Sequence, residues 1–254
     1  MANLAINFVK AVPFVGRNEF GGIRNAPQAV LDLVKTVKDA VGWQTGIGDT
    51  GYKGGYEARH VDVYGYDVER QLAVVQVRRC WKKKESWYPE VSKAYALIGI
   101  DDGQVFSHTL DGSPRRQRDF DYQSPEDTVK WAESKIFNVP VARLGTIIRQ
   151  GDVALVRIKA LPPRVRKVAL TDGQRVHTVT LAGSHSVTVD GDLYEKVYTF
   201  RDGREFVEER YSVGLVESDH ARGQHKAVCA EGRFRLAEGL RGLEPWWADT
   251  DLGD

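Results

Sequence analysis

Sulfur is scarce in this chain of 254 residues, which has two cysteines and one methionine. Cys80 and Cys229 stand far apart and form no CxxC pair, so a disulfide framework and a thiolate zinc site both lack ligands. The chain also has no large excess of charge of either sign, because its 36 Lys and Arg residues nearly balance its 35 Asp and Glu residues. This balance removes the strongest sequence argument for a nucleic-acid or membrane-surface partner, although local patches survive such averaging.

A long hydrophobic run is missing as well. Residues 1–15 contain one lysine and a broken apolar stretch, which is too short and polar for a membrane span and lacks the cationic lead of a signal peptide. We therefore expect a cytoplasmic protein with no membrane partner. The 42% hydrophobic and 28% charged residues are ordinary globular usage and allow a sizeable core.

The first part of the chain predicts two helices. Asn25 can cap one and Pro27 suits its first turn, with Val30, Leu31, Val34 and Val37 then recurring at helical spacing up to about Gly42. The run Ser124-Pro125-Glu126-Asp127 predicts the start of a second, because serine can accept from free amides and the acids face the positive helix end. Residues 46–55 are rich in glycine and predict a loop.

Strand patterns separate these helices. Alternating apolar residues at 61–64 and 72–77 predict a pair joined by a turn at 67–70. Residues 94–100 and 104–109 flank Asp101-Asp102-Gly103, where aspartate and glycine suit a tight hairpin turn. Together with the helices, these strands predict an antiparallel α+β region at 1–143.

From Thr146 onward the pattern is nearly all β. Short apolar strands alternate with turn residues, among them Asp190-Gly191-Asp192 and Glu231-Gly232, which is typical of a small barrel or sandwich, a cupin-like one included. We expect this β domain at 144–239, followed by a C-terminal tail at 240–254. The fold class is therefore α+β.

The run Arg149-Gln150-Gly151-Asp152-Val153 resembles the start of a β-rich domain in a family of uncharacterised phage and bacterial proteins. That family then has a histidine-bearing turn, a second histidine pair and a closing strand, which here match residues 181–186, His220 with His225, and 231–236. The resemblance implies a phage or mobile-element origin and a histidine-bearing β domain. Where relatives often have a second histidine two positions after the first, this chain has Val187.

Four of the six histidines fall between His177 and His225, and imidazole is the commonest protein ligand for transition metals. In a cupin-like barrel, His185, His220 and His225 with Glu217 or Asp219 could hold a divalent metal. His220 and His225 are five residues apart, so they converge only if residues 221–224 form a turn. The alternative is that these are surface or loop histidines, and His177 reads as structural.

A basic and aromatic stretch between Arg78 and Lys93 predicts a second kind of site. Cations neutralise phosphates while flat rings stack on bases, which is how proteins bind single-stranded nucleic acid. The alternative is a solvated hairpin loop, and Glu85 and Glu90 dilute the charge. The candidate residues are Arg78, Arg79, Trp81, Lys82, Lys83, Lys84 and Trp87.

No motif identifies a reaction. Cys80 lies among cations that would lower the pKa of its thiol, but nothing places a base beside it. Ser184 and His185 are neighbours that would face opposite ways on a strand. Three hypotheses therefore stand: a binding protein whose β domain recognises a protein partner or ligand, a metal-dependent cupin-like enzyme, and a nucleic-acid-binding accessory protein.

Overall fold

The computed structural model describes residues 23, 25–43, 45–49, 56–82, 90–101, 103–110, 112, 124–220 and 226–239. These residues form two compact units, which meet in the sequence between Lys135 and Ile136. The predicted boundary lay slightly later, at 143, and the predicted tail at 240–254 lies outside the described residues. No described helix is long and apolar enough to cross a membrane.

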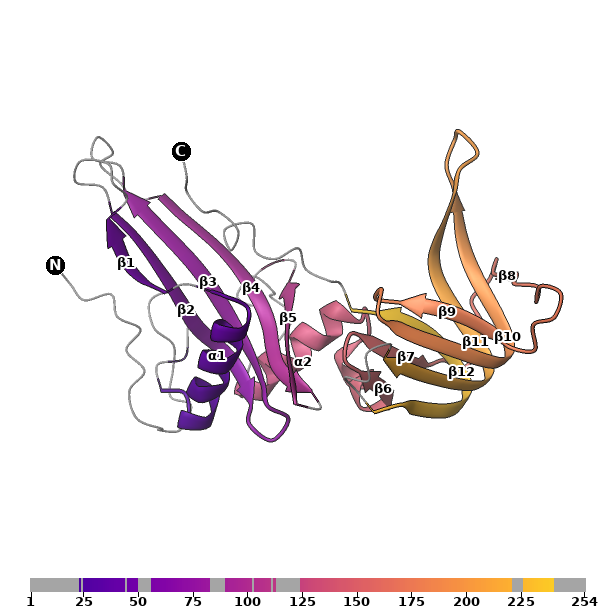
Figure 1. Cartoon of the computed structure of the whole chain (residues 1–254), viewed down its shortest axis with the longest axis horizontal. Coiled ribbons are helices and arrows are strands. Elements are labelled where there is room, and N and C mark those ends of the chain that lie inside the picture. Colours follow the sequence, from indigo (N-terminus) through magenta and orange to yellow (C-terminus); the bar gives the residue numbers. More distant parts are fainter. Residues whose placement is uncertain are drawn as a thin grey trace. The chain divides into compact units, whose positions relative to one another are not determined.

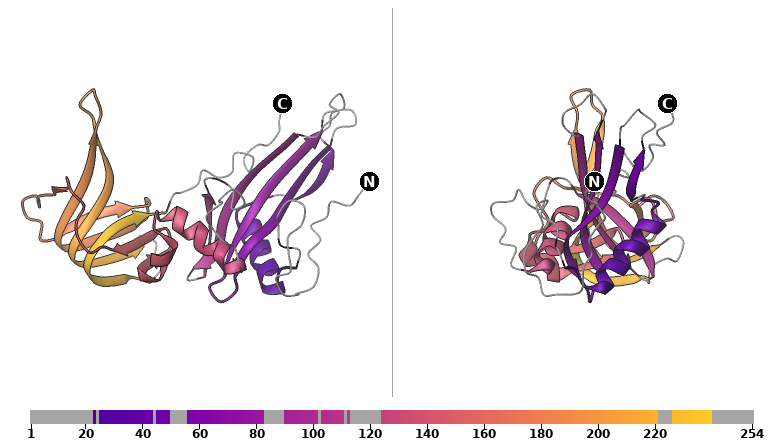
Figure 2. Two further views of the ribbon diagram at one scale, coloured as in Figure 1. Left: turned by 180° about the vertical axis from the view of Figure 1, so that it is seen from behind. Right: turned by 90° about the vertical axis from the view of Figure 1, so that its left-hand side faces the viewer.

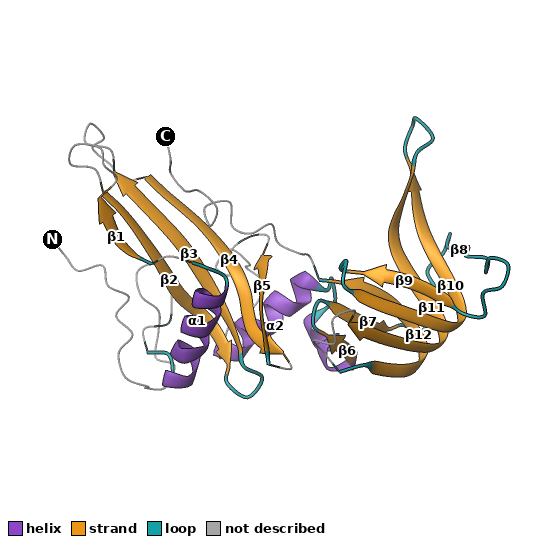
Figure 3. Cartoon of the chain, viewed as in Figure 1, coloured by secondary structure: helices purple, strands orange, loops and turns teal. Residues whose placement is uncertain are grey.

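The first unit is a five-stranded antiparallel sheet with two helices (Figure 1; Figure 3). The strands follow chain order from one edge to the other, and each pairs with the next. The elements are α1 (Gln28–Ala40), β1 (Gly46–Asp49), β2 (Tyr56–Asp67), β3 (Leu72–Lys82), β4 (Glu90–Asp101), β5 (Gln104–Leu110) and α2 (Pro125–Ile136).

The two helices lie on opposite faces of this sheet (Figure 2). On one face, α1 buries Val30, Val34 and Val37 in a core shared with Val63 and Val75. On the other, α2 passes so close to β2 that a Cβ added at Gly65 would lie 2.4 Å from Thr128 Cβ. Both faces are therefore covered, which explains why β3 is buried from Leu72 to Arg79.

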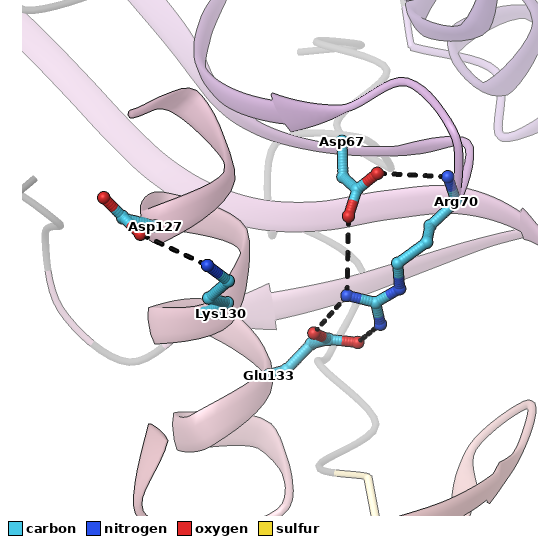
Figure 4. A network of polar contacts seen from close by, with 5 residues as sticks. All are labelled: Asp67, Arg70, Asp127, Lys130 and Glu133. Carbon is cyan, nitrogen blue, oxygen red and sulfur yellow. Dashed lines mark hydrogen bonds and ion pairs between the residues drawn. The ribbon is translucent and has the colours of Figure 1, made fainter. Parts of the chain in front are cut away.

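An ion pair with a buried carboxylate joins α2 to the turn between β2 and β3 (Figure 4). Glu133 is 2% exposed, and both of its carboxylate oxygens accept from the Arg70 guanidinium, one of them from Nη1 at 2.9 Å. Asp67 holds the Arg70 end by accepting from the Arg70 backbone N–H at 3.1 Å. These hydrogen bonds to Glu133 and the nearby Asp67 raise the pKa of Arg70 against the opposing effect of burial.

Two local predictions for this unit are wrong. Gly46–Asp49 were expected in a loop but form β1 at the edge of the sheet, because strand pairing there uses the backbone and needs no apolar side chain. Asn25 does not cap α1, since Pro27 occupies the N-cap position and its carbonyl accepts from Val30 and Leu31. The predicted hairpins and the second helix are confirmed, with Val129, Ala132 and Ile136 buried along α2.

The second unit is a seven-stranded antiparallel sheet ordered β6-β7-β12-β11-β10-β8, with β9 also pairing with β10. A short 3-10 helix, Val141–Thr146, precedes it. The strands are β6 (Ile147–Gln150), β7 (Val153–Arg157), β8 (Arg166–Lys167), β9 (His177–Leu181), β10 (His185–Thr199), β11 (Glu205–His220) and β12 (Val228–Glu238).

A row of three glycines crosses the centre of this sheet. Gly191 of β10 pairs with Gly214 of β11, which pairs with Gly232 of β12. Their φ angles are +143°, +133° and +148°, a backbone region that residues with a side chain rarely adopt. The sheet curls over on itself, and Ala182, at the end of β9, donates its N–H to Glu238 of β12 at 2.9 Å.

This row overturns two predicted turns. Asp190-Gly191-Asp192 and Glu231-Gly232 lie inside continuous strands, because glycine lets a strand bend without ending it. The curled sheet encloses a core that includes Leu155, Val189 and Phe234.

The α+β class is confirmed, with the helices in the first unit and an antiparallel β unit after it. The barrel alternative is wrong, and with it the cupin-like barrel, since the strand order runs openly from β6 to β8.

Candidate functional site

Two of the predicted metal ligands lie side by side in the second unit. His185 and His220 are cross-strand partners on β10 and β11, both are buried, and their ring centroids are 4.7 Å apart at 87°. An edge-to-face contact of this kind is how aromatic rings pack in a core. Ser184 Oγ lies 3.3 Å from His185 Nδ1, contrary to expectation, because Ser184 lies in the turn before β10 and not on a strand.

The remaining predicted ligands do not join this pair. Glu217 is exposed and three residues from buried His220 on the same strand, so their side chains point to opposite faces. His225 lies outside the described residues. His177, which was predicted to be structural and not a ligand, is buried and pairs with Val189 at the other end of β9. Within the described ranges, no three His, Cys, Asp or Glu side chains form a group that could hold a metal. Binding of a divalent metal stays a prediction, and of its proposed ligands only His185 and His220 are shown to lie together.

The basic-aromatic stretch is only partly described. Arg78 and Arg79 are buried in β3, where Arg78 Nη2 lies 3.5 Å from Asp62 Oδ2 and Arg79 stacks 5.2 Å from the ring of Trp81. Two of the residues that were predicted to bind phosphates are therefore buried inside the first unit. The Lys82 side chain, Lys83, Lys84 and Trp87 lie outside the description, and single-stranded nucleic acid binding stays a prediction.

Cys80 differs from its prediction. Burial raises the pKa of its thiol, and this outweighs the nearby Arg78, which acts in the opposite direction. We expect Cys229, which is exposed, to react with iodoacetamide at pH 8 about tenfold or more faster than Cys80. Peptide mass spectrometry of the native protein measures both rates, and a Cys229→Ser variant isolates the slow reaction. Equal rates at the two thiols would contradict the prediction.

The most exposed apolar surface described in the second unit lies at the end of the long β10–β11 hairpin, which projects beyond the sheet (Figure 1). Tyr198, Phe200 and Phe206 are 56%, 44% and 59% exposed. Tyr198 pairs with Phe206 across the strands, and its ring centroid lies 5.0 Å from that of Phe200. We call these three residues the aromatic tip.

The turn that carries the aromatic tip is held by its own hydrogen bonds. Phe200 donates its N–H to the Arg204 carbonyl at 2.8 Å, and Gly203 donates back to the Phe200 carbonyl at 3.0 Å. Asp202 accepts from Arg204 Nε at 2.7 Å, and the Arg204 guanidinium lies 5.5 Å from the Phe200 ring. The aromatic side chains are therefore presented from an ordered turn.

A groove of about 640 Å³ lies along the β11 side of this hairpin. Residues 205–210 of β11 line one side and residues 235–238 of β12 the other, with Leu181 of β9 also lining it. Arg235 is engaged here, because its Nη2 donates to the carbonyls of Phe137 and Asn138 at 2.6 and 3.0 Å. We call this feature the hairpin groove.

The hairpin is acidic. Residues 185–220 contain nine Asp and Glu residues against four Lys and Arg residues. The cations are largely paired: Lys196 Nζ lies 2.9 Å from Glu208, Arg210 Nε 3.3 Å from Glu195, and Arg204 Nε 2.7 Å from Asp202. A phosphate backbone would meet net negative charge here, which disfavours nucleic-acid binding at the hairpin.

No protein-family model, curated protein or solved structure matches this chain. The resemblance to phage and bacterial proteins therefore stays a prediction. The aromatic tip was not predicted from the sequence, although Tyr198 and Phe206 lie close on either side of Asp202-Gly203, a residue pair typical of turns. Large apolar residues beside a surface turn could have indicated the tip, because side chains at such a turn lie far from any buried core.

Proposed function

We propose that this chain is a binding protein whose second unit recognises a protein partner through the projecting hairpin. The single observation that carries this proposal is the exposed aromatic tip. Contiguous apolar surface on a soluble protein marks sites of interaction, and aromatic residues are enriched among those that contribute most binding energy.

The hydrogen-bonded turn that carries the rings supports the same proposal. A backbone that is already ordered loses little conformational entropy on binding, and aromatic side chains have few rotatable bonds, so more of the contact energy remains as affinity. Cross-strand aromatic pairs also stabilise a two-stranded hairpin, and that structural role is the main alternative explanation of the tip.

Site-specific crosslinking tests the proposal. We expect a photo-crosslinking residue at position 206 to give a discrete adduct in an extract of the source cells. The same residue at position 215 should give none, because Leu215 is exposed on the same strand but lies away from the tip. Unlabelled wild-type protein should compete for the adduct at a concentration about tenfold or more below that needed by a Tyr198→Ser/Phe206→Ser double variant.

Two results would contradict the proposal. One is equal adduct formation from positions 206 and 215. The other is equal competition by the wild type and the double variant. Far-UV circular dichroism and the unfolding temperature of the double variant show whether a loss of competition merely reflects loss of the hairpin.

A further inference from the structure

The free edge of β11 beside the hairpin groove defines a more specific way of binding. β11 pairs with β10 from Glu205 to His220, but it pairs with β12 only from Arg210 to Ser218. Among the described strands, residues 205–209 therefore have a neighbour on one side only. An unpaired strand edge presents backbone donors and acceptors that can bind another extended chain.

The groove exists because β12 leaves β11 at this point. Leu236, opposite Arg210, is the last residue of β12 that pairs with β11, whereas β12 stays paired with β7 on its other side through Ala237 and Glu238. The two strands separate beyond Leu236, and the hairpin groove occupies the space between them. An added strand could therefore pair with the backbone of β11 on one side and contact residues 235–238 of β12 on the other.

The side chains of this groove determine which strand fits. Four glutamates of the lining outnumber its two arginines, and they are Glu205, Glu208, Glu209 and Glu238. Glu205 also pairs with Arg166 at 3.0 Å and Glu208 with Lys196 at 2.9 Å, but both side chains, like that of Glu238, are about half exposed. Both arginines of the lining are engaged by carboxylates. Arg210 Nε lies 3.3 Å from Glu195, and Arg235 Nη1 lies 3.7 Å from Glu209. Phe206, Val207 and Leu236 add apolar surface between the acids. The complement is a chain that alternates cationic and apolar residues.

We propose that the hairpin groove binds an extended, lysine- or arginine-rich segment of the partner protein as an additional antiparallel or parallel strand along residues 205–209 of β11. This inference rests on the proposed function and names the chemistry of the partner. Main-chain hydrogen bonds supply affinity in such strand addition, and the side-chain pattern supplies specificity. Tyr198 and Phe200 then contact the partner beyond the added strand, whereas Phe206 belongs to both the aromatic tip and the groove.

A designed peptide tests this inference with the full-length chain. The probe has about eight residues, alternates lysine with valine, and is long enough at about 3.4 Å per residue to pass the whole edge. We expect it to bind and to slow amide hydrogen exchange within residues 205–209. A peptide that alternates glutamate with valine should bind about tenfold or more weakly, because it meets the same acidic side chains.

Two matched changes separate strand addition from simple charge attraction. N-methylation of alternate amides along one edge of the lysine peptide should weaken binding about tenfold, since it removes backbone donors at constant charge. Glu208→Lys should also weaken binding, whereas Glu217→Lys, an exposed site elsewhere on β11, should leave it within about twofold at moderate salt.

Each outcome decides the inference. Binding without slowed exchange at residues 205–209, binding that is insensitive to N-methylation, or no binding of the lysine peptide would overturn it. If position 206 still forms its adduct while the peptide neither binds nor competes, strand addition is wrong and the proposed function stands. Loss of the adduct itself removes the proposed function.

Discussion

Replacing Gly214 by alanine is expected to unfold the second unit or to lower its free energy of unfolding by more than about 3 kcal/mol. Gly214 has φ +133°, and a Cβ there would lie 2.3 Å from the Asp190 carbonyl oxygen. That atom belongs to the backbone of a paired strand, so it cannot move aside without breaking the β10–β11 ladder. Typical domains have only about 5–15 kcal/mol of stability, which makes this cost a large share.

Hydrogen exchange monitored by mass spectrometry measures the effect, because fast exchange within residues 185–220 reports the second unit directly. All six tryptophans lie outside residues 136–241, so tryptophan fluorescence provides an internal reference in the same sample. Gly145→Ala is the matched control, since nothing lies within 4 Å of a Cβ added there. A Gly214→Ala protein as protected from exchange as the control would show that the glycine row is dispensable.

Replacing Arg70 by methionine is expected to lower the stability of the first unit by about 2–3 kcal/mol. The change leaves the Glu133 carboxylate, 2% exposed, without the guanidinium that donates to both its oxygens. The expected loss lies below that of a fully enclosed ion pair, because the Arg70 side chain is 47% exposed and water can reach the site.

Chemical denaturation followed by tryptophan fluorescence measures this loss, since Trp131 is buried on the same helix as Glu133. Lys130→Met is the control, because the Lys130–Asp127 pair on the exposed side of α2 is expected to contribute under about 1 kcal/mol. Restoring apolar packing with Glu133→Met in the Arg70→Met background should recover part of the stability. Equal denaturation midpoints for Arg70→Met and Lys130→Met would refute the role assigned to the Arg70–Glu133 pair.

Local patterns predicted much of the fold. Apolar spacing along α1 and α2 identified both helices, and Asp101-Asp102-Gly103 identified the β4–β5 hairpin, where Gly103 has φ +82°. These features depend on neighbours within a few residues, which a single sequence contains. The path of β10 and β12 through Gly191 and Gly232 could not be predicted, because their pairing with Gly214 is a property of three distant segments.

The candidate site was harder to predict for the same reason. The pairing of His185 with His220 follows from the register of β10 and β11, which the sequence does not state. Arg78 and Arg79 appeared to form a cationic surface, but β3 is covered on both faces and encloses them. The hairpin groove arises where β12 turns away from β11 after Leu236, and no residue type marks that departure.

The unpaired edge of β11 also affects how readily the protein associates with itself at high concentration. Exposed strand edges invite identical molecules to stack into fibrils, and proteins commonly oppose this with charge. Two such edges brought together would place Glu205, Glu208 and Glu209 of one molecule against the same carboxylates of the next. Like charges would thus disfavour homotypic stacking, while the same edge stays open to a chain of opposite sign.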